Sequence, residues 1–266
     1  MKVLIACERF GVTRDAFLMA GHDAMSCDLV DTVIPGPHYK GDVRDILNEG
    51  WDLMIAHPDC TYLTNSAAWA YKDGPYHQKV KPGTLVGAER RAARVEALDF
   101  VRLLMAAPIP RIAIENPVGV ISTSIKKPDQ YIQPYEYGDD ASKKTGLWLT
   151  NLPKLVPTKF VPPRLVCSSC GTVFPYGEEN CPKCSSTKYL PRWSNQTNSG
   201  QNKLSPGEGR AMERAKTYSG WADAMVKQWG NLNDKEVRAN YQTNWYDDRT
   251  RGGVSGRMCT GYPNEP

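Results

Sequence analysis

Short apolar runs alternate along the first half of the chain with segments in which apolar residues recur every three or four positions. The runs predict strands at Lys2–Ala6, Ala24–Cys27, Asp52–Ala56, Arg111–Glu115 and Gly146–Thr150, because apolar runs this short are typical of buried strands. The segments between them predict helices at Thr13–Ala20, Asp45–Glu49 and Ala88–Met105. Strands that alternate with helices indicate an α/β fold with a parallel sheet covered on both faces.

Chemically active side chains follow several of these predicted strands. Ligands of such sheets bind beyond the carboxyl ends of the strands, which here are Ala6–Gly11, Asp28, His57–Cys60 and Glu115–Pro117. A cysteine at the mouth of a sheet is a candidate nucleophile, although a small buried residue is an equally ordinary reading. Glu115 is a candidate acid–base group, because a buried strand positions it before a chain-turning Asn-Pro.

Two further acids and one histidine join these candidates. Asp28 and Asp42 follow apolar or turn segments, and each can accept hydrogen bonds from a ribose or an adenine amine. His57 is close to Cys60 in the chain and is a candidate substrate contact.

The second half of the chain is organised differently. Residues 151–166 are rich in proline and predict an extended linker, and 193–208 predict a polar loop. Arg210–Trp229 is compatible with a helix interrupted near Tyr218–Gly220. We therefore expect a core at 1–150, a cysteine-rich insertion at 151–204, a segment returning to the core at 205–230, and a polar tail at 231–266.

Four of the eight cysteines form a regular array. Two C-x₂-C pairs are separated by ten residues, at Cys167, Cys170, Cys181 and Cys184. Each pair presents two thiolates on a tight turn, and two such turns complete a tetrahedral four-sulfur site for Zn²⁺. The spacing predicts a structural zinc ribbon and disfavours redox activity.

Charge is distributed unevenly along the 266 residues. The chain has 33 basic and 29 acidic side chains, but residues 1–140 have a net charge of −4 and residues 141–220 one of +8. A basic segment on an acidic half predicts a nucleic-acid partner, with a merely solvated basic face as the alternative. The tryptophans are expected in the core, and stacking on a base is an alternative for Trp193 beside Arg192.

The sequence also predicts the cellular compartment of the protein. No apolar run approaches the ~18–20 residues that span a bilayer, so we expect no membrane partner. The start of the chain, MKVLIACERF, predicts a buried strand and not a signal peptide. We therefore expect a cytoplasmic protein.

Taken in order, the motifs of residues 1–150 and 205–230 resemble the DNA cytosine-5 methyltransferases, in a compact phage- and prophage-type branch. The family's first cofactor element is similar to Ala6–Phe17, its Pro-Pro-Cys loop to Pro58-Asp59-Cys60, and its Glu-Asn element to Glu115-Asn116. Its later basic motif is most similar to Tyr137–Thr145, and its returning segment to Lys216–Met225. The resemblance implies a Rossmann-like S-adenosylmethionine-dependent methyltransferase sheet, with the zinc ribbon in the position of the target-recognition domain.

The resemblance also implies roles for individual residues. Cys60 would attack cytosine C6, Glu115 would hydrogen-bond the base, Asn116 would fix the loop, and Lys143 or Lys144 would steady that loop or a target phosphate. The residues expected to bind S-adenosylmethionine are Ala6, Cys7, Glu8, Phe10, Gly11, Asp28, Asp42 and Pro58. In duplex DNA the target base must first flip out of the stack.

Several departures from the family pattern keep alternatives open. Asp59 replaces a proline next to Cys60, the first loop has the single glycine Gly11, and no large recognition domain is present. The alternatives are the same chemistry on free dCMP, transfer of a different group to a pyrimidine C5, and an inactive relative that binds nucleic acid through the ribbon.

Overall fold

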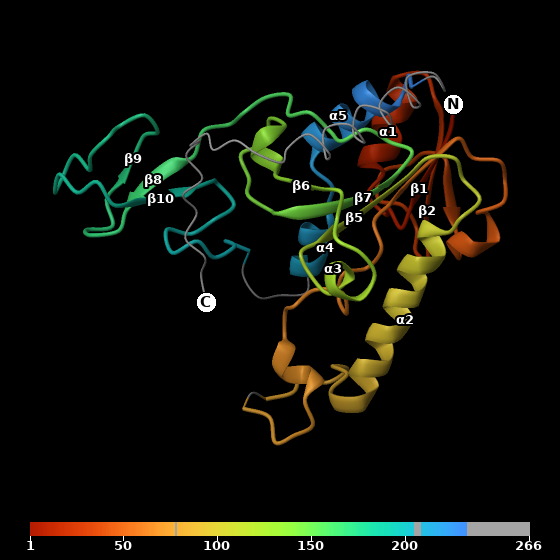
Figure 1. Ribbon diagram of the computed structural model, residues 1–266, viewed down its shortest axis with the longest axis horizontal. Coiled ribbons are helices and arrows are strands. Elements are labelled where there is room, and N and C mark those ends of the chain that lie inside the picture. The colour runs from red at the N-terminus through yellow and green to blue at the C-terminus, as the bar shows by residue number, and fades with distance from the viewer. Residues whose placement is uncertain (78, 205–208, 233–266) are drawn as a thin grey trace, which may run out of the picture. The chain divides into compact units, whose positions relative to one another are not determined.

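The computed structural model describes residues 1–77, 79–204 and 209–232, and the chain from Met1 to Asn231 forms one compact unit (Figure 1). Its main sheet has seven strands in the order β3-β2-β1-β4-β5-β7-β6. These strands are β1 Lys2–Ala6, β2 Asp23–Asp28, β3 His38–Lys40, β4 Leu53–Ala56, β5 Ile112–Pro117, β6 Gln130–Ile132 and β7 Thr145–Thr150.

The first five strands of the sheet are parallel. The chain starts in the middle, at β1, and builds outward to β2 and β3 on one side and to β4 and β5 on the other. The strand order therefore reverses between β1 and β4, and ligands of doubly wound sheets bind beyond the strand ends at such a point. The sequence prediction of a Rossmann-like α/β fold is confirmed.

Helices cover both faces of this sheet. They are α1 Val12–Met19, α2 Gly87–Met105, α3 Ile121–Ser124, α4 Gly209–Ala215 and α5 Ser219–Trp229, with short 3₁₀ turns η1 Val43–Asp45, η2 Ala68–Tyr71 and η3 Pro134–Glu136. Figure 1 shows α1 and α5 on one side of the sheet and α2 on the other. Leu98, Val101 and Leu104 of α2 pack onto alternate residues of the central strands, such as Leu4 and Met54.

Two features of the sheet differ from the sequence prediction. The strand predicted at Gly146–Thr150 is present, but β7 pairs antiparallel with β5, because the chain reverses through a loop and β6 and no long helix separates the two strands. The short strands β3 and β6 were not predicted, since three-residue runs carry too little periodicity. The helix predicted at Asp45–Glu49 is not formed: a 3₁₀ turn at Val43–Asp45, in which the Asp42 side chain accepts the Arg44 N–H, is followed by hydrogen-bonded turns.

A second, smaller sheet follows the proline-rich linker. Strands β8 Arg164–Cys167, β9 Val173–Phe174 and β10 Tyr189–Arg192 pair antiparallel in the order β10-β8-β9. After it, residues 193–204 form the predicted loop, and the predicted interruption of the last helical segment lies between α4 and α5. Of the predicted polar tail at 231–266, residues 233–266 lie outside the described part of the chain. In the described part of the chain, no helix has the length and apolar character to cross a membrane.

Candidate active site

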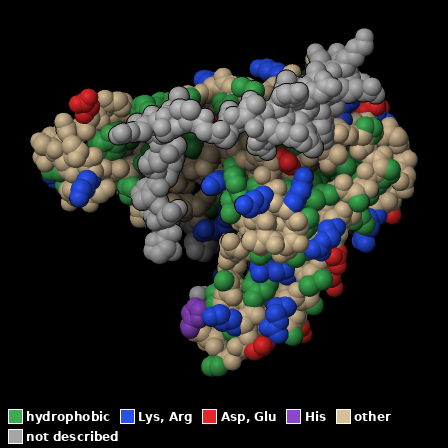
Figure 2. All heavy atoms as spheres, in the orientation of Figure 1, with side chains coloured by type: hydrophobic (Ala, Val, Ile, Leu, Met, Phe, Trp, Pro, Cys, Tyr) green, Lys and Arg blue, Asp and Glu red, His purple; other side chains and the backbone are tan. Residues whose placement is uncertain are grey.

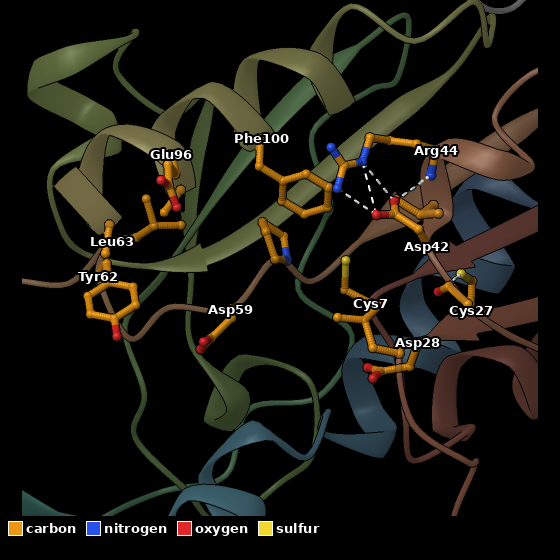
Figure 3. Close-up of a pocket in the computed structure, with 16 residues that line it drawn as sticks. Cys7, Cys27, Asp28, Asp42, Arg44, Asp59, Tyr62, Leu63, Glu96 and Phe100 are labelled. Carbon is orange, nitrogen blue, oxygen red and sulfur yellow. Dashed lines mark hydrogen bonds and ion pairs between the residues drawn. The ribbon is translucent and has the colours of Figure 1, made fainter. Parts of the chain in front are cut away.

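A cavity of about 390 Å³ lies at the reversal point of the sheet (Figure 3). Four of the residues predicted to bind a cofactor line it, each just after or at the end of a parallel strand or in the following turn: Cys7, Asp28, Asp42 and Pro58. In Figure 3, Asp28 and Asp42 lie at one end and Tyr62 and Glu96 at the other. The cavity is therefore elongated along the strand ends.

The other predicted cofactor residues build the loop around this cavity and do not line it. Glu8 is buried, and its two carboxylate oxygens accept the backbone N–H groups of Thr13 and Arg14 at 2.7 and 3.2 Å. Glu8 therefore caps the start of α1, where a carboxylate is favoured. Gly11 has a positive φ of 76° that turns the chain into α1.

The remaining two residues of this group, Ala6 and Phe10, also lie outside the lining. Ala6 is fully buried in β1, and its carbonyl accepts the His57 N–H at 2.9 Å. Phe10 is half-buried in the turn before Gly11.

The cavity has an excess of negative charge. Asp42 is paired with Arg44, whose hydrogen bonds lower the pKa of that carboxyl. Among the described residues, the other three lining acids, Asp28, Asp59 and Glu96, have no ion-pair partner. Such a lining favours a ligand that carries positive charge.

The loop that carries Cys60 is held tightly. The Cys60 carbonyl accepts the N–H groups of Leu63 and Thr64, each at 3.1 Å, and Arg94 of α2 donates to the carbonyls of Tyr62 and Thr64 at 2.8 and 3.0 Å. Pro58 and Asp59 face the first cavity. The Cys60 backbone is therefore fixed before any ligand arrives.

Charges around the Cys60 thiol oppose one another. Burial is the largest influence and raises its pKa; Asp59 and Glu115 raise it further, whereas Lys143 and Arg214 lower it. The Asp59 carboxylate accepts the N–H and hydroxyl of Thr61 at 3.0 and 2.8 Å. The net effect is a raised thiol pKa, so at neutral pH the thiolate is the minor form.

Glu115 lies at the end of β5 between two nitrogen-bearing side chains. Its Oε2 is 3.0 Å from His57 Nδ1, and its Oε1 is 4.0 Å from Lys143 Nζ. Burial raises the pKa of the carboxyl, but Lys143, His57 and the Thr145 hydroxyl together outweigh burial and lower it below its usual value. Oε1 is buried and makes no hydrogen bond within the described residues. An ionised, buried oxygen without a donor is the kind of group that a polar ligand satisfies.

Asn116 links β5 to the Cys60 loop. Its side-chain N–H donates to the Pro58 carbonyl at 2.7 Å, and the residue is almost fully buried. The bond joins residues 58 positions apart in the sequence. Asn116 therefore holds the nucleophile loop against the strand that carries Glu115.

A second cavity, of about 540 Å³, lies on the other side of the Cys60 loop. Thr64–Ser66 line it together with basic side chains from three segments: Lys143, Lys144, Lys203 and Arg214, against the single acid Glu213. On the face drawn in Figure 2, Lys and Arg side chains gather in the middle and lower part, to the right of the small sheet. This cavity has the charge expected for binding a polyanion.

Sequence reasoning missed several residues of both cavities. Glu96 and Phe100 of α2 line the first cavity, although the helix carried only a core-packing signal. The loop with Asn195, Asn202 and Lys203 lines the second cavity. In the sequence, the one feature that could have pointed to this loop is its Asn- and Gln-rich composition around Lys203.

Trp193 is a buried packing residue, as the leading interpretation predicted, and the alternative of stacking on a base is not supported. Its ring is buried and stacks on Tyr135 with centroids 3.9 Å apart, and its indole N–H donates to the Val161 carbonyl at 2.9 Å. The neighbouring Arg192 donates to the backbone carbonyls of Asn198 and Pro191. Both side chains therefore hold the linker and the loop together.

The four predicted metal ligands come together on the small sheet and its turns. The sulfur atoms of Cys167, Cys170, Cys181 and Cys184 all lie within 4.8 Å of one another. Cys167 and Cys181 are buried beside Leu165 and Phe174. Four sulfur donors at this spacing are compatible with a tetrahedral metal site.

Comparison with known proteins gives little beyond the geometry. No protein-family model matches the chain, and no curated protein matches it. A solved structure described as a candidate DNA modification methyltransferase encoded within a prophage (E. coli) is similar with a TM-score of 0.38 and 14% identity. The match covers 60% of this chain and 51% of that one, so the chain spans about half of that protein's length.

Proposed function

We propose that this protein transfers a methyl group from S-adenosylmethionine to C5 of cytosine in DNA through a covalent Cys60 adduct. One observation carries the proposal. The Cys60 loop contributes Pro58 and Asp59 to the acid-lined cavity and Thr64–Ser66 to the basic cavity, and its nearest buried carboxylate, Glu115, has an oxygen without a hydrogen bond. A donor pocket, a nucleophile and an acceptor pocket are therefore adjacent.

The first cavity suits S-adenosylmethionine by shape and charge. The cofactor carries a sulfonium cation, which the excess carboxylates at Asp28, Asp59 and Glu96 would attract. Asp28, at the end of β2, would accept the ribose hydroxyls, and Asp42 would lie near the adenine. When bound, the cofactor supplies an electrophilic methyl group.

The side chains of this site would carry the remaining chemistry. The Cys60 thiolate forms a bond to cytosine C6, which makes C5 nucleophilic towards the methyl group. The ionised Glu115 oxygen accepts a hydrogen bond from the exocyclic amine and holds the ring in position for attack, while the neighbouring Lys143 cation opposes the negative charge that builds on the ring. A base, supplied by solvent water, then takes the C5 proton, the C5–C6 double bond re-forms, and the C6–sulfur bond breaks to release the Cys60 thiolate.

DNA is favoured over free dCMP by the second cavity. Lys144, Lys203 and Arg214 spread basic charge over about 540 Å³, which exceeds what the single phosphate of a mononucleotide needs. A strand that passes through this cavity would deliver a flipped base towards Lys143 and Glu115. Lys143 is 4.0 Å from the Glu115 carboxylate, so it would steady the site from the substrate side.

We further infer that the four-cysteine cluster holds Zn²⁺ in a structural site. Four thiolates leave no open coordination position, which is the arrangement of structural and not catalytic zinc. The metal would stabilise the small sheet, which in sequence comes just before the loop that lines the second cavity.

The decisive experiment is trapping on DNA that carries 5-fluorocytosine. The fluorine cannot leave as a proton does, so the protein should remain covalently attached in the presence of S-adenosylmethionine. Cys60→Ser should abolish the adduct, whereas Cys259→Ser, in the predicted polar tail, should retain it. Adduct position is read by mass spectrometry of the cross-linked peptide.

Other outcomes would select among the alternatives. Labelled methyl transfer to dCMP but not to DNA would assign free nucleotides as the substrate. A nucleoside mass shift other than that of a methyl group would identify a different transferred group. Absence of S-adenosylmethionine binding by calorimetry, with DNA binding retained, would identify an inactive nucleic-acid-binding protein.

A further inference from the structure

The His57 side chain contacts Glu115, and the resemblance to the methyltransferase family implies no role for this histidine. Its backbone N–H donates to the Ala6 carbonyl at 2.9 Å, which continues the pairing of β4 with β1 beyond Ala56. Its side chain is 9% exposed, and its Nδ1 lies 3.0 Å from Glu115 Oε2. The imidazole ring is therefore positioned by the central sheet and aimed along the strand ends at the carboxylate.

The chemistry of the pair assigns the proton on the ring. Glu115 has a lowered pKa, so its carboxylate is ionised at neutral pH and can only accept a hydrogen bond. Nδ1 must then carry the hydrogen, an assignment made from the hydrogen-bond network. His57 Nε2 is buried and has no hydrogen-bond partner among the described residues. Within the described residues, the one hydrogen bond of the His57 ring is with Glu115, so the ring can act on a substrate through that carboxylate.

The two carboxylate oxygens of Glu115 therefore differ in their hydrogen bonding. Oε2 is used by His57, whereas Oε1 makes no hydrogen bond and has Lys143 Nζ 4.0 Å away. Partial rotation of the carboxylate about its Cγ–Cδ bond would lose the His57 bond, so this bond restrains the plane of the carboxylate. A fixed carboxylate presents one free oxygen in one place, and misplacement of a reacting group by about 1 Å can cost about 100-fold in rate.

We propose that His57 is a positioning residue whose Nδ1–H fixes one oxygen of Glu115 and leaves the other free for the exocyclic amine of the target cytosine. The inference rests on the proposed function for the identity of the base. The pairing itself concerns only His57 and Glu115, so it can be measured without turnover.

Several charged groups lie near Glu115, and a titration must distinguish the ionisation of Glu115 from theirs. Lys143, before β7, and His57, after β4, lower the pKa of the Glu115 carboxyl against its burial. Cys60 lies near enough to sense the charge of Glu115, and it also senses Asp59 and Arg214. A titration that is specific for Glu115 is therefore needed, because the acid limb of an activity profile combines several groups.

The test compares His57→Phe with His57→Asn. Phenylalanine fills the ring volume without a donor, whereas the asparagine amide can replace Nδ1–H. The Glu115 side chain is followed by carbon NMR of labelled glutamate, assigned with Glu115→Gln. We expect its pKa to rise in His57→Phe and to remain near the wild-type value in His57→Asn. His22→Asn, in the turn after α1, should leave it unchanged.

Kinetics supply the second readout. His57→Phe should lower kcat by about 100-fold at neutral pH with little change in KM, and His57→Asn should restore most of the loss. An unchanged Glu115 titration in folded His57→Phe would overturn the positioning role; if that variant does not fold, a shifted titration in His57→Asn would overturn it. If Glu115 titrates as expected but the wild-type protein forms no adduct with 5-fluorocytosine DNA, the positioning role stands and the proposed function fails.

Discussion

Cys60 and Glu115 belong to one small region, yet their surroundings shift their pKa values in opposite directions. Burial, with Asp59, raises the pKa of the thiol, whereas Lys143 and His57 hold the Glu115 carboxyl in its ionised form. The carboxylate is thus ready to accept a hydrogen bond, while the thiol gives up its proton only at higher pH. We expect the rate of adduct formation to rise with pH until the thiol pKa is passed.

Substitution of the charges nearest Cys60 should move its reactivity in opposite directions. Asp59→Asn removes a negative charge and should lower the thiol pKa, so alkylation of Cys60 by iodoacetamide at pH 7.5 should accelerate by roughly 3- to 10-fold. Lys143→Met should slow alkylation by a similar factor. Peptide mass spectrometry isolates Cys60 from the other cysteines. Asp73→Asn, an exposed position that pairs with Arg91 of α2, serves as the control, and equal rates in all variants would contradict the charge assignment.

The strands and helices contribute by holding the Cys60 loop from two sides. Arg94 of α2 donates to the loop carbonyls of Tyr62 and Thr64, and the segment after β5 pairs with the loop through the Val120 N–H and the Leu63 carbonyl, 2.8 Å apart. At Gly119 the two backbones are so close that a Cβ would lie 2.0 Å from the Leu63 carbonyl oxygen. Only glycine permits this contact.

Gly119→Ala should therefore displace the nucleophile loop. The Leu63 backbone can make room for a Cβ only by shifting the loop. We therefore expect the free energy of unfolding to fall by about 1–3 kcal/mol and adduct formation to fall by about 100-fold. Thermal unfolding and trapping on 5-fluorocytosine DNA measure the two effects separately. Thr123→Ala, an exposed position on α3, should change neither. Wild-type trapping in Gly119→Ala would show that the loop tolerates movement.

At the level of the whole molecule, the small sheet depends on cysteines for half of its buried cluster. Its buried cluster consists of Leu165, Cys167, Phe174 and Cys181, and two of these four residues are proposed metal ligands. A core of this size is too small to be stable alone. The seven-stranded sheet has a far larger core and does not depend on the metal.

Removal of zinc should thus unfold one part of the chain and spare the other. We expect one zinc per chain by elemental analysis, and rapid amide exchange over Arg164–Arg192 after chelation, with β1 and β4 still protected. Cys181→Ser should reproduce the exchange pattern, and Cys60→Ser should retain zinc. A protected small sheet in metal-free protein would refute the structural role.

The basic cavity and the ribbon surface make separable predictions for DNA binding. The double variant Lys144→Ala/Lys203→Ala removes two charges from the cavity lining and should reduce the slope of log affinity against log salt by about 2. Lys183→Ala/Lys188→Ala removes two charges from the small sheet's turns, outside both cavities, and should leave the slope unchanged. The reverse result would move the DNA path onto the ribbon.

The sequence by itself determined the alternation of strands and helices, the four-cysteine cluster and the convergence of Cys60 and Glu115. Each of these follows from local periodicity or spacing, together with the rule that parallel strands end at one edge of a sheet. Lys2–Ala6 was predicted at its observed bounds because a short apolar run is fully specified by its own residues.

Only the tertiary structure decided how distant residues share their polar groups. Glu8 caps α1, Trp193 stacks on Tyr135, and His57 fixes Glu115 across 58 positions of sequence. The antiparallel direction of β7 and the basic cavity beside residues 195–204 likewise depend on chain reversal and register. Hydrophobic periodicity reports which positions are buried, but not which buried donor meets which acceptor, because that depends on atoms brought together by packing.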